Sequence, residues 1–259
     1  MGVLNVTPDS FSDGGDFFVP EKAVERALLM ESEGAAIIDI GGESTRPGAA
    51  PVSEQDEIDR VVPVIEALQC RLGVPISIDT QKPAVMRAAI QAGAGFINDV
   101  NALREPGALQ VAAECAVPVC LMHMQGEPRT MQADPHYVDV VDEVKDFLQQ
   151  RVHACERSGI PANRILLDPG FGFGKTVDHN LRLLARLDEL GKLKFPLLVG
   201  LSRKSMIGKL LGLKVGERLP ASLALAVLAV ERGAKLVRSH DVAATWQALQ
   251  MSAALHEID

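Results

Sequence analysis

Eight short apolar runs, many rich in β-branched residues, recur along the 259 residues of the chain. The runs are VLNV (3–6), AAIIDI (35–40), VPISID (74–79), FINDV (96–100), VPVCLM (117–122), RILLD (164–168), LLVGLS (197–202) and LVRSHD (236–241). Each run is continuous rather than alternating, which is typical of parallel strands covered on both faces. Eight strand–helix repeats over about 250 residues predict a (β/α)8 TIM barrel, with a doubly wound open sheet as the alternative.

Helical segments separate these runs, and the clearest covers 56–68. Its apolar stripe consists of Ile58, Val61, Val62, Ile65 and Leu68. Ser53 with Asp56 resembles a capping box at its start. Five glycines follow helical segments and fit helix C-termini, namely Gly34, Gly73, Gly93, Gly159 and Gly233. No linker or low-complexity tract divides the chain, so we expect a single domain over residues 1–259.

Composition excludes several classes of protein. With 47% hydrophobic and 23% charged residues, the chain has ample material for a large core. No apolar run reaches the roughly 18 residues that a membrane span requires. The net charge of −8 argues against general nucleic-acid binding, although it permits anionic substrates. The four cysteines form no C-x-x-C pair, which indicates reduced, mostly buried thiols and a cytoplasmic location.

Polar residues end every predicted strand. They are Asn5, Asp39, Asp79, Asn98, His123, Asp168, the triplet Ser202-Arg203-Lys204, and Arg238 with His240. In a TIM barrel the active site lies at the C-terminal ends of the strands. One such residue is equally well explained as a cap or a core hydrogen bond, but eight together predict a site at the barrel mouth.

Two chemical groups separate within this set. Asp79, Asn98 and Asp168 are short acceptor or amide side chains, which suit the edge of a flat, nitrogen-rich heterocycle. A buried polar network is the alternative interpretation. Asn5, Arg46, Arg238 and His240 suit phosphate oxygens, because arginine supplies forked charged donors.

The stretch DPGFGFGKT (168–176) is similar to a phosphate-binding loop, but Pro169 stands where its first glycine should be. We expect Gly170, Gly172 and Gly174 to let the backbone pass close to a ligand. Phe171 or Phe173 then forms an apolar wall, and Lys175 lies in solvent. His123 has no evident partner, and no histidine or cysteine spacing indicates zinc.

At these residues the chain closely resembles the dihydropteroate synthase family. The resemblance rests on LNVTPDSFSDGG, DIGGESTRPGA, SIDTQKPAV, GAGFINDV, LMHMQGEPRTMQ, LLDPGFGFGK, GLSRKSMIG and RSHD, which extend from residue 2 to residue 241. It implies condensation of 6-hydroxymethyl-7,8-dihydropterin diphosphate with 4-aminobenzoate, giving 7,8-dihydropteroate and diphosphate in folate biosynthesis. Members of the family usually carry an N-terminal β-hairpin before the position matching Met1, so the resemblance also implies an uncovered barrel floor or a start further upstream.

The resemblance assigns roles residue by residue. Asp79, Asn98, Asp168 and Lys204 hold the pterin, with Met122 beneath the ring. Asn5, Arg46, Arg238 and His240 hold the diphosphate, and Asn5 also helps to bind Mg2+. The 4-aminobenzoate is bordered by Thr45, Pro47, Phe173, Lys204 and Ser205.

Residues and resemblance agree on a mechanism. If the C–O bond breaks first, the cation is delocalised into the electron-rich pterin, so the enzyme stabilises charge and needs no strong base. Arg46, Lys204, Arg238 and His240 are the catalytic candidates, and Mg2+ would offset charge on the departing diphosphate.

Three other functions are alternatives to this reaction. Lys204 among other cations is compatible with a Schiff-base aldolase. A corrinoid-linked methyltransferase uses a similar pterin barrel, but leaves the STRPG and SRKS segments unexplained. A non-catalytic pterin-binding module would have one half of the site degraded, whereas both halves are intact here.

Two further expectations concern assembly and order of binding. Segment 220–232 is apolar nearly all round, which predicts a second copy packed against it in a homodimer. Loops 7–18 and 41–51 are rich in Gly, Ser and Pro and have the composition of active-site lids. We therefore expect 4-aminobenzoate or a sulfonamide to bind well only after the pterin and diphosphate sites are filled.

Overall fold

The computed structural model describes residues 1–7, 20–44, 50–127 and 130–256. Within them, parallel strands form one eight-stranded sheet in sequential order. The strands are β1 (Gly2–Asn5), β2 (Ile38–Gly41), β3 (Ile76–Asp79), β4 (Phe96–Asp99), β5 (Val119–Met122), β6 (Ile165–Asp168), β7 (Leu197–Gly200) and β8 (Ala234–Arg238). A parallel bridge between Gly2 and Ser239 joins the last strand to the first. The predicted (β/α)8 barrel is therefore confirmed, and the open doubly wound sheet is excluded.

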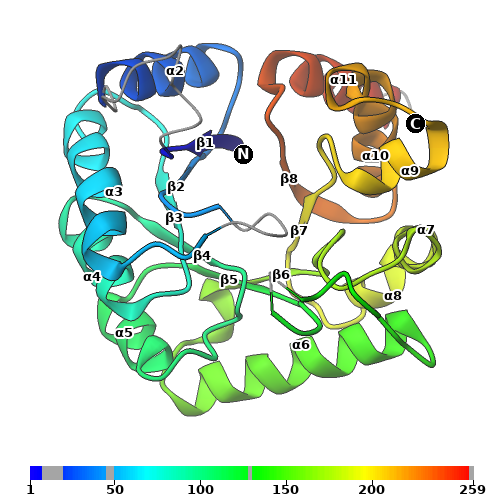
Figure 1. The fold of residues 1–259 in the computed structure, drawn as a ribbon, viewed down its shortest axis with the longest axis horizontal. Helices are drawn as coiled ribbons and strands as arrows, with labels where there is room; N and C mark the ends of the chain where they lie inside the picture. Colours follow the sequence, from blue (N-terminus) through cyan, green and yellow to red (C-terminus); the bar gives the residue numbers. More distant parts are fainter. Residues whose placement is uncertain (8–19, 45–49, 128–129, 257–259) are drawn as a thin grey trace.

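Helices surround the strands on the outside of the barrel (Figure 1). They are α2 (Pro20–Ser32), α3 (Glu54–Leu68), α4 (Pro83–Gln91), α5 (Ala108–Cys115), α6 (Val140–Arg157), α7 (Val177–Ala185), α8 (Leu187–Gly191), α9 (Ser205–Leu211), α10 (Leu219–Glu231) and α11 (Val242–His256). Short 3-10 turns occupy Ala162–Arg164 and Val215–Glu217. None of these described helices is long and apolar enough to cross a membrane.

Alternation along each strand separates two apolar layers. Residues such as Ile78, Ile97 and Leu167 belong to the large core between strands and helices. The intervening residues point into the barrel, because successive side chains of a strand face opposite sides. Met1, Phe96, Cys120 and Leu198 fill the lower interior as a separate apolar cluster. The polar strand-end residues continue the same inward-facing positions, so they lie above that cluster at the barrel mouth.

Helix α3 confirms its predicted cap and corrects its predicted stripe. Ser53 Oγ accepts the Asp56 N–H at 3.1 Å and donates to Asp56 Oδ2 at 2.7 Å. The buried side chains are Glu57, Val61, Val64, Ile65 and Leu68, whereas Ile58 and Val62 are only half-buried. Glu57 can enter the buried face because Lys82 Nζ, on the loop before α4, pairs with its carboxylate.

Strand β8 differs from its predicted position. It covers 234–238 rather than 236–241, so Arg238 is its last residue and His240 lies in the following turn. Ser239 N–H donates to the Met1 carbonyl at 2.9 Å, and the chain then turns towards α11. Of the five glycines expected at helix ends, Gly34, Gly93, Gly159 and Gly233 have positive φ, as a left-handed C-terminal stop requires.

Candidate active site at the barrel mouth

Strand register brings the predicted pterin residues to one level. Asp79 is paired with Asn98 across β3 and β4, and Met122 with Asp168 across β5 and β6. Asn98 and Asp168 are 5% and 6% exposed. Inward-facing polar side chains therefore meet at the top of the barrel from strands far apart in sequence.

Asp39 is the centre of this arrangement, although sequence reasoning identified it only as a strand end. Its Oδ1 accepts the Ser77 hydroxyl at 2.6 Å, and its Oδ2 accepts Asn98 Nδ2 at 3.0 Å. Oδ2 also accepts Arg238 Nε at 2.6 Å. The carboxylate is fully buried and fixes which way the Asn98 amide points. A charged residue inside an otherwise apolar strand was the only available sequence signal.

Arg238 joins the two predicted groups. Besides Asp39, its guanidinium donates from Nη2 to Asp79 Oδ2 at 2.7 Å. Asp79 Oδ1 is buried and has no hydrogen-bond partner among the described residues. Burial raises the pKa of Asp79 to about 7, and Arg238 opposes that rise. Asp79 Oδ1 is therefore a buried oxygen of this group that a ligand N–H could satisfy.

Asp168 has a divided role. Its Oδ1 accepts the Gly170 N–H at 2.7 Å, which fixes the start of the loop after β6. Burial raises its pKa, while the Gly170 hydrogen bond and the charge of Lys204 oppose the rise. The second carboxylate oxygen makes no hydrogen bond with the described residues and remains able to accept a ligand N–H.

Lys204 and Phe173 form one side of the mouth. Lys204 Nζ lies 4.3 Å from the centroid of the Phe173 ring, a cation–π contact. Burial lowers the pKa of Lys204 to about 8, with Asp168 opposing the shift. Phe173 also packs against a small apolar cluster that contains Met122. Ser205 is exposed at the start of α9, immediately after Lys204.

His240, predicted to contact phosphate oxygens, lies in the turn after β8 beside Ser202. Its Nδ1 is 3.1 Å from Ser202 Oγ. Burial and the neighbouring Arg238 lower its pKa to about 4, so the imidazole is neutral near pH 7. In this ligand-free state, the ring can offer a phosphate an N–H. Asn5 ends β1 and is half-buried, and its side chain makes no hydrogen bond with the described residues.

Lys175 was placed wrongly in solvent. Its side chain is 3% exposed, and Nζ lies 2.9 Å from Nδ1 of His123, which therefore does have a partner.

The glycines of the loop after β6 make room for neighbouring backbone, in addition to the ligand contact that the sequence predicted. A Cβ on Gly170 would approach the His123 carbonyl oxygen to 1.9 Å, and one on Gly174 would approach the Gln125 carbonyl oxygen to 2.5 Å. A Cβ on Gly172 would instead contact the side chain of Lys204, a predicted site residue, and one on Gly170 would also approach Met122.

The two phenylalanines of the loop have separate places. Phe171 is 1% exposed and belongs to the core, so Phe173 alone of the pair borders the mouth.

The predicted residues Thr45, Arg46 and Pro47 lie outside the described residues, as do most of loop 7–18 and the centre of loop 41–51. The described residues hold no group of three or more His, Cys, Asp or Glu side chains that could bind a metal ion.

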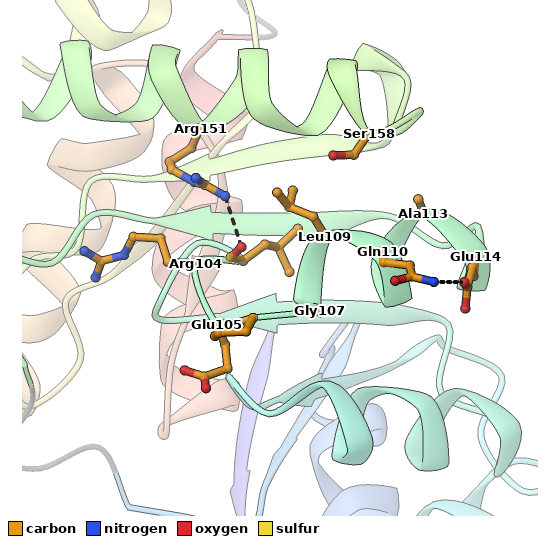
Figure 2. Close-up of a pocket in the computed structure, with 11 residues that line it drawn as sticks. Arg104, Glu105, Gly107, Leu109, Gln110, Ala113, Glu114, Arg151 and Ser158 are labelled. Atoms are coloured by element: carbon orange, nitrogen blue, oxygen red, sulfur yellow. Dashed lines mark hydrogen bonds between the residues drawn. The ribbon is translucent and has the colours of Figure 1, made fainter.

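A separate pocket of about 770 Å³ lies on the outer side of the barrel (Figure 2). It is lined by the segment after β4, by α5, and by Arg151 and Ser158 from α6 and its C-terminal end. Arg151 Nη2 donates to the Leu103 carbonyl at 3.1 Å, so this arginine is committed to the chain itself. None of the strand-end residues lines the pocket, which is therefore distinct from the candidate active site.

Comparison with known proteins agrees with this geometry. Residues 1–240 match the model of the pterin binding enzyme family. The dihydropteroate synthase of Escherichia coli strain K12 is 55% identical over 251 residues, covering 97% of this chain and 89% of that protein. The Yersinia pestis dihydropteroate synthase in a sulfonamide drug complex superposes with a TM-score of 0.95 at 53% identity, covering 99% of this chain and 93% of the other. The Xanthomonas albilineans dihydropteroate synthase with 4-aminobenzoic acid gives 0.93 at 53% identity, covering 98% and 92%. This chain therefore belongs to the pterin-binding enzymes, as a member of the dihydropteroate synthase family.

Proposed function

We propose that this protein is a transferase that joins 6-hydroxymethyl-7,8-dihydropterin diphosphate to 4-aminobenzoate, releasing diphosphate and forming 7,8-dihydropteroate for folate biosynthesis. The observation that carries the proposal is the unpartnered, buried Asp79 Oδ1 beside the fixed Asn98 amide. An unpaired buried acceptor is costly, and a ring N–H from the substrate would satisfy it. Asp168 supplies a second acceptor, and Met122 an apolar surface under the ring.

The reaction breaks the methylene C–O bond, whose electron pair leaves on the diphosphate oxygen. The electron-rich pterin delocalises the resulting cation, and the amine nitrogen then forms the C–N bond and loses its proton. The arylamine is already neutral near pH 7, so the site needs charge stabilisation rather than a strong base. Arg238 and Lys204 supply positive charge, and the neutral His240 supplies an N–H. Arg46 is assigned to the same diphosphate.

Phe173 and Lys204, with Ser205, are assigned to the arylamine. The Phe173 ring offers an apolar face to the aromatic amine, and Lys204 lies over that ring. Thr45 and Pro47 complete this assignment. The sulfonamide and 4-aminobenzoic acid complexes of the two relatives support an arylamine site in this chain as well.

Mg2+ is proposed as a metal held mainly by the substrate. Mg2+ is typically bound through one or two protein oxygens together with substrate phosphates and water. A single amide oxygen from Asn5 fits that role, and the described residues offer no all-protein metal cluster in competition. When bound, the ion would offset negative charge on the departing diphosphate.

A coupled assay for diphosphate release tests the proposed reaction. Purified protein is given pterin diphosphate and Mg2+, with and without 4-aminobenzoate. We expect rapid release only when the amine is present, together with formation of dihydropteroate. Release that is independent of the amine, or no release at all, would contradict the proposed function.

A homodimer is proposed from the surface of α9–α11. Leu228 of α10 is 42% exposed, and Met251 and Leu255 of α11 are 68% and 66% exposed. Leu210 and Leu211 at the end of α9 add to this surface. Exposed apolar side chains on α9, α10 and α11 fit a two-fold interface with a second copy. The free thiols of all four cysteines, of which Cys70 is exposed, support a cytoplasmic location.

Sedimentation tests the dimer. We expect a dimer at micromolar concentration and a shift towards monomer in Leu228→Glu. Leu181→Glu, on α7 and 38% exposed, is the matched control and should leave the assembly unchanged. A parent protein that sediments only as a monomer at this concentration would contradict the proposed homodimer.

A further inference from the structure

The ammonium group of Lys175 has all three hydrogen bonds satisfied but makes no direct ion pair with the described residues, and Asp168 acts on it only from a distance. Its Nζ lies 2.9 Å from His123 Nδ1, and it donates to the Gly170 carbonyl at 2.9 Å and to the Phe173 carbonyl at 3.1 Å. Three N–H groups thus meet three neutral acceptors, which is the full capacity of an ammonium. Burying a cation without an ion pair is costly. Burial accordingly lowers the pKa of Lys175 to about 7.

His123 is adapted to accept this hydrogen bond. Its ring makes an edge contact with Phe147 at 4.9 Å between centroids, and Tyr137 lies 6.0 Å away. Burial, reinforced by the charge of Lys175, lowers the pKa of His123 to about 2. The imidazole therefore stays neutral, and in the tautomer that carries its proton on Nε2 the lone pair of Nδ1 accepts from Lys175.

The acceptors of Lys175 join the end of β5 to the loop after β6. His123 follows β5, whereas Gly170 and Phe173 lie in the loop. Further bonds to the same loop come from Asn180 Oδ1, which accepts the Gly172 N–H at 2.7 Å, and from Tyr137, whose hydroxyl donates to the Gly174 carbonyl at 2.8 Å. The ammonium alone contacts the carbonyl of Phe173 itself.

We propose that Lys175 is a positioning residue of the arylamine site: its buried ammonium fixes the loop after β6 so that the Phe173 ring stays against Lys204. This role rests on the assignment of Phe173 and Lys204 to 4-aminobenzoate in the proposed function. All three hydrogen bonds of Lys175 go to His123 and to carbonyls of the loop, so its buried ammonium group is engaged by the chain itself. It acts through the loop carbonyls, which would lose their only charged donor if it were removed.

Lys175→Met tests the proposal, because methionine keeps an unbranched apolar side chain and removes the ammonium. Lys192→Met, at the exposed C-terminal end of α8, is the matched control. In the variant we expect the KM for 4-aminobenzoate to rise about tenfold, while the KM for pterin diphosphate changes less than about twofold. A general loss of folded protein would instead lower kcat and leave both KM values unchanged.

His123→Phe provides a second route to the same test. It keeps a ring against Phe147 but removes one acceptor of Lys175, so we expect the same shift in KM, only smaller. In the double variant with Lys175→Met, the His123 change should add little, because the two residues act through one hydrogen bond. Fully additive effects would overturn the proposed coupling.

Hydrogen exchange of the backbone amides gives a readout that does not depend on turnover. Peptides covering 169–176 should exchange at least about tenfold faster in Lys175→Met, with the other strands unchanged. If the parent protein lacks the proposed activity, this arm still decides whether Lys175 fixes the loop. Unchanged exchange in the loop, or equal rises in both KM values, would overturn the proposal.

Discussion

The two sides of the barrel mouth are built differently. On the side assigned to the pterin, Asp39, Asn98 and Arg238 form a continuous hydrogen-bonded network whose distances run from 2.6 to 3.0 Å. On the side assigned to the diphosphate, the side chain of Asn5 makes no hydrogen bond within the described part of the chain. The ring of His240 lies beside Ser202. The side chains of the first side are therefore held in place by one another, with Asp79 Oδ1 left for a ligand, whereas Asn5 on the second side is not held in this way.

This difference follows from the chemistry of the two ligands. A neutral heterocycle is recognised by oriented acceptors and donors, which must be fixed in advance because misdirected groups cost free energy when buried. A diphosphate brings its own charge and can draw donors and Mg2+ to itself. Arg238 belongs to both sides, since it faces the mouth and also holds two carboxylates.

The largest effect should come from removing that shared residue. Arg238→Met leaves the buried carboxylates of Asp39 and Asp79 without a cation, which should lower the free energy of unfolding by roughly 3 kcal/mol. Arg182→Met removes an exposed pair with Asp178 and should have little or no effect. Denaturant unfolding measures both. Equal stability of the two variants would show that the network is not a structural unit.

Asp168→Asn should act on pterin affinity with the fold retained. The asparagine oxygen can still accept the Gly170 N–H, but its NH2 then replaces the acceptor oxygen that faces the ligand. Leaving a ligand N–H unpaired costs roughly 1–3 kcal/mol, or about tenfold or more in affinity. Calorimetry with a pterin measures this loss, with the exposed Asp178→Asn as control. Unchanged affinity would refute the assignment of Asp168.

A smaller effect should appear in the pH dependence of stability. The pKa of His240 is about 4 in the folded protein and about 6.5 when unfolded, so the unfolded chain binds the extra proton between these values. The contribution of a neutral His240 is therefore present above about pH 6.5 and is lost as the pH falls towards 4. Unfolding of the parent and His240→Gln across this window should show a flatter profile in the variant. Parallel profiles would mean that His240 is not buried as a neutral group.

Sequence reasoning predicted which side chains the barrel brings together, because polar residues interrupt apolar strands at their ends. Asp79, Asn98 and Asp168 each end a run, and the barrel brings such ends together whatever the loops do. The same reasoning missed what depends on packing. The role of Asp39 requires knowing that Ser77 and Arg238 point at it, and nothing local marks that approach.

Lys175 shows the limit most clearly. A lysine after a glycine-rich turn is ordinarily solvated, and the pattern FGFGK gives no sign that His123, 52 residues earlier, lies behind it. The glycines were similarly read as space for a ligand, whereas Gly170 and Gly174 make room for the backbone after β5. Contacts between segments distant in sequence determine both the burial of Lys175 and the need for Gly170 and Gly174.

Calorimetric titration of the parent protein tests most directly whether the pterin site is formed in the free protein while the arylamine site forms only after the other ligands bind. A pterin is titrated without diphosphate, and then a sulfonamide is titrated with and without pterin and Mg-diphosphate. The account predicts that the pterin binds the free protein, because its acceptors are already fixed, and that the sulfonamide binds well only once both other sites are filled. Pterin binding that requires diphosphate, or sulfonamide binding of equal affinity in both conditions, would contradict it.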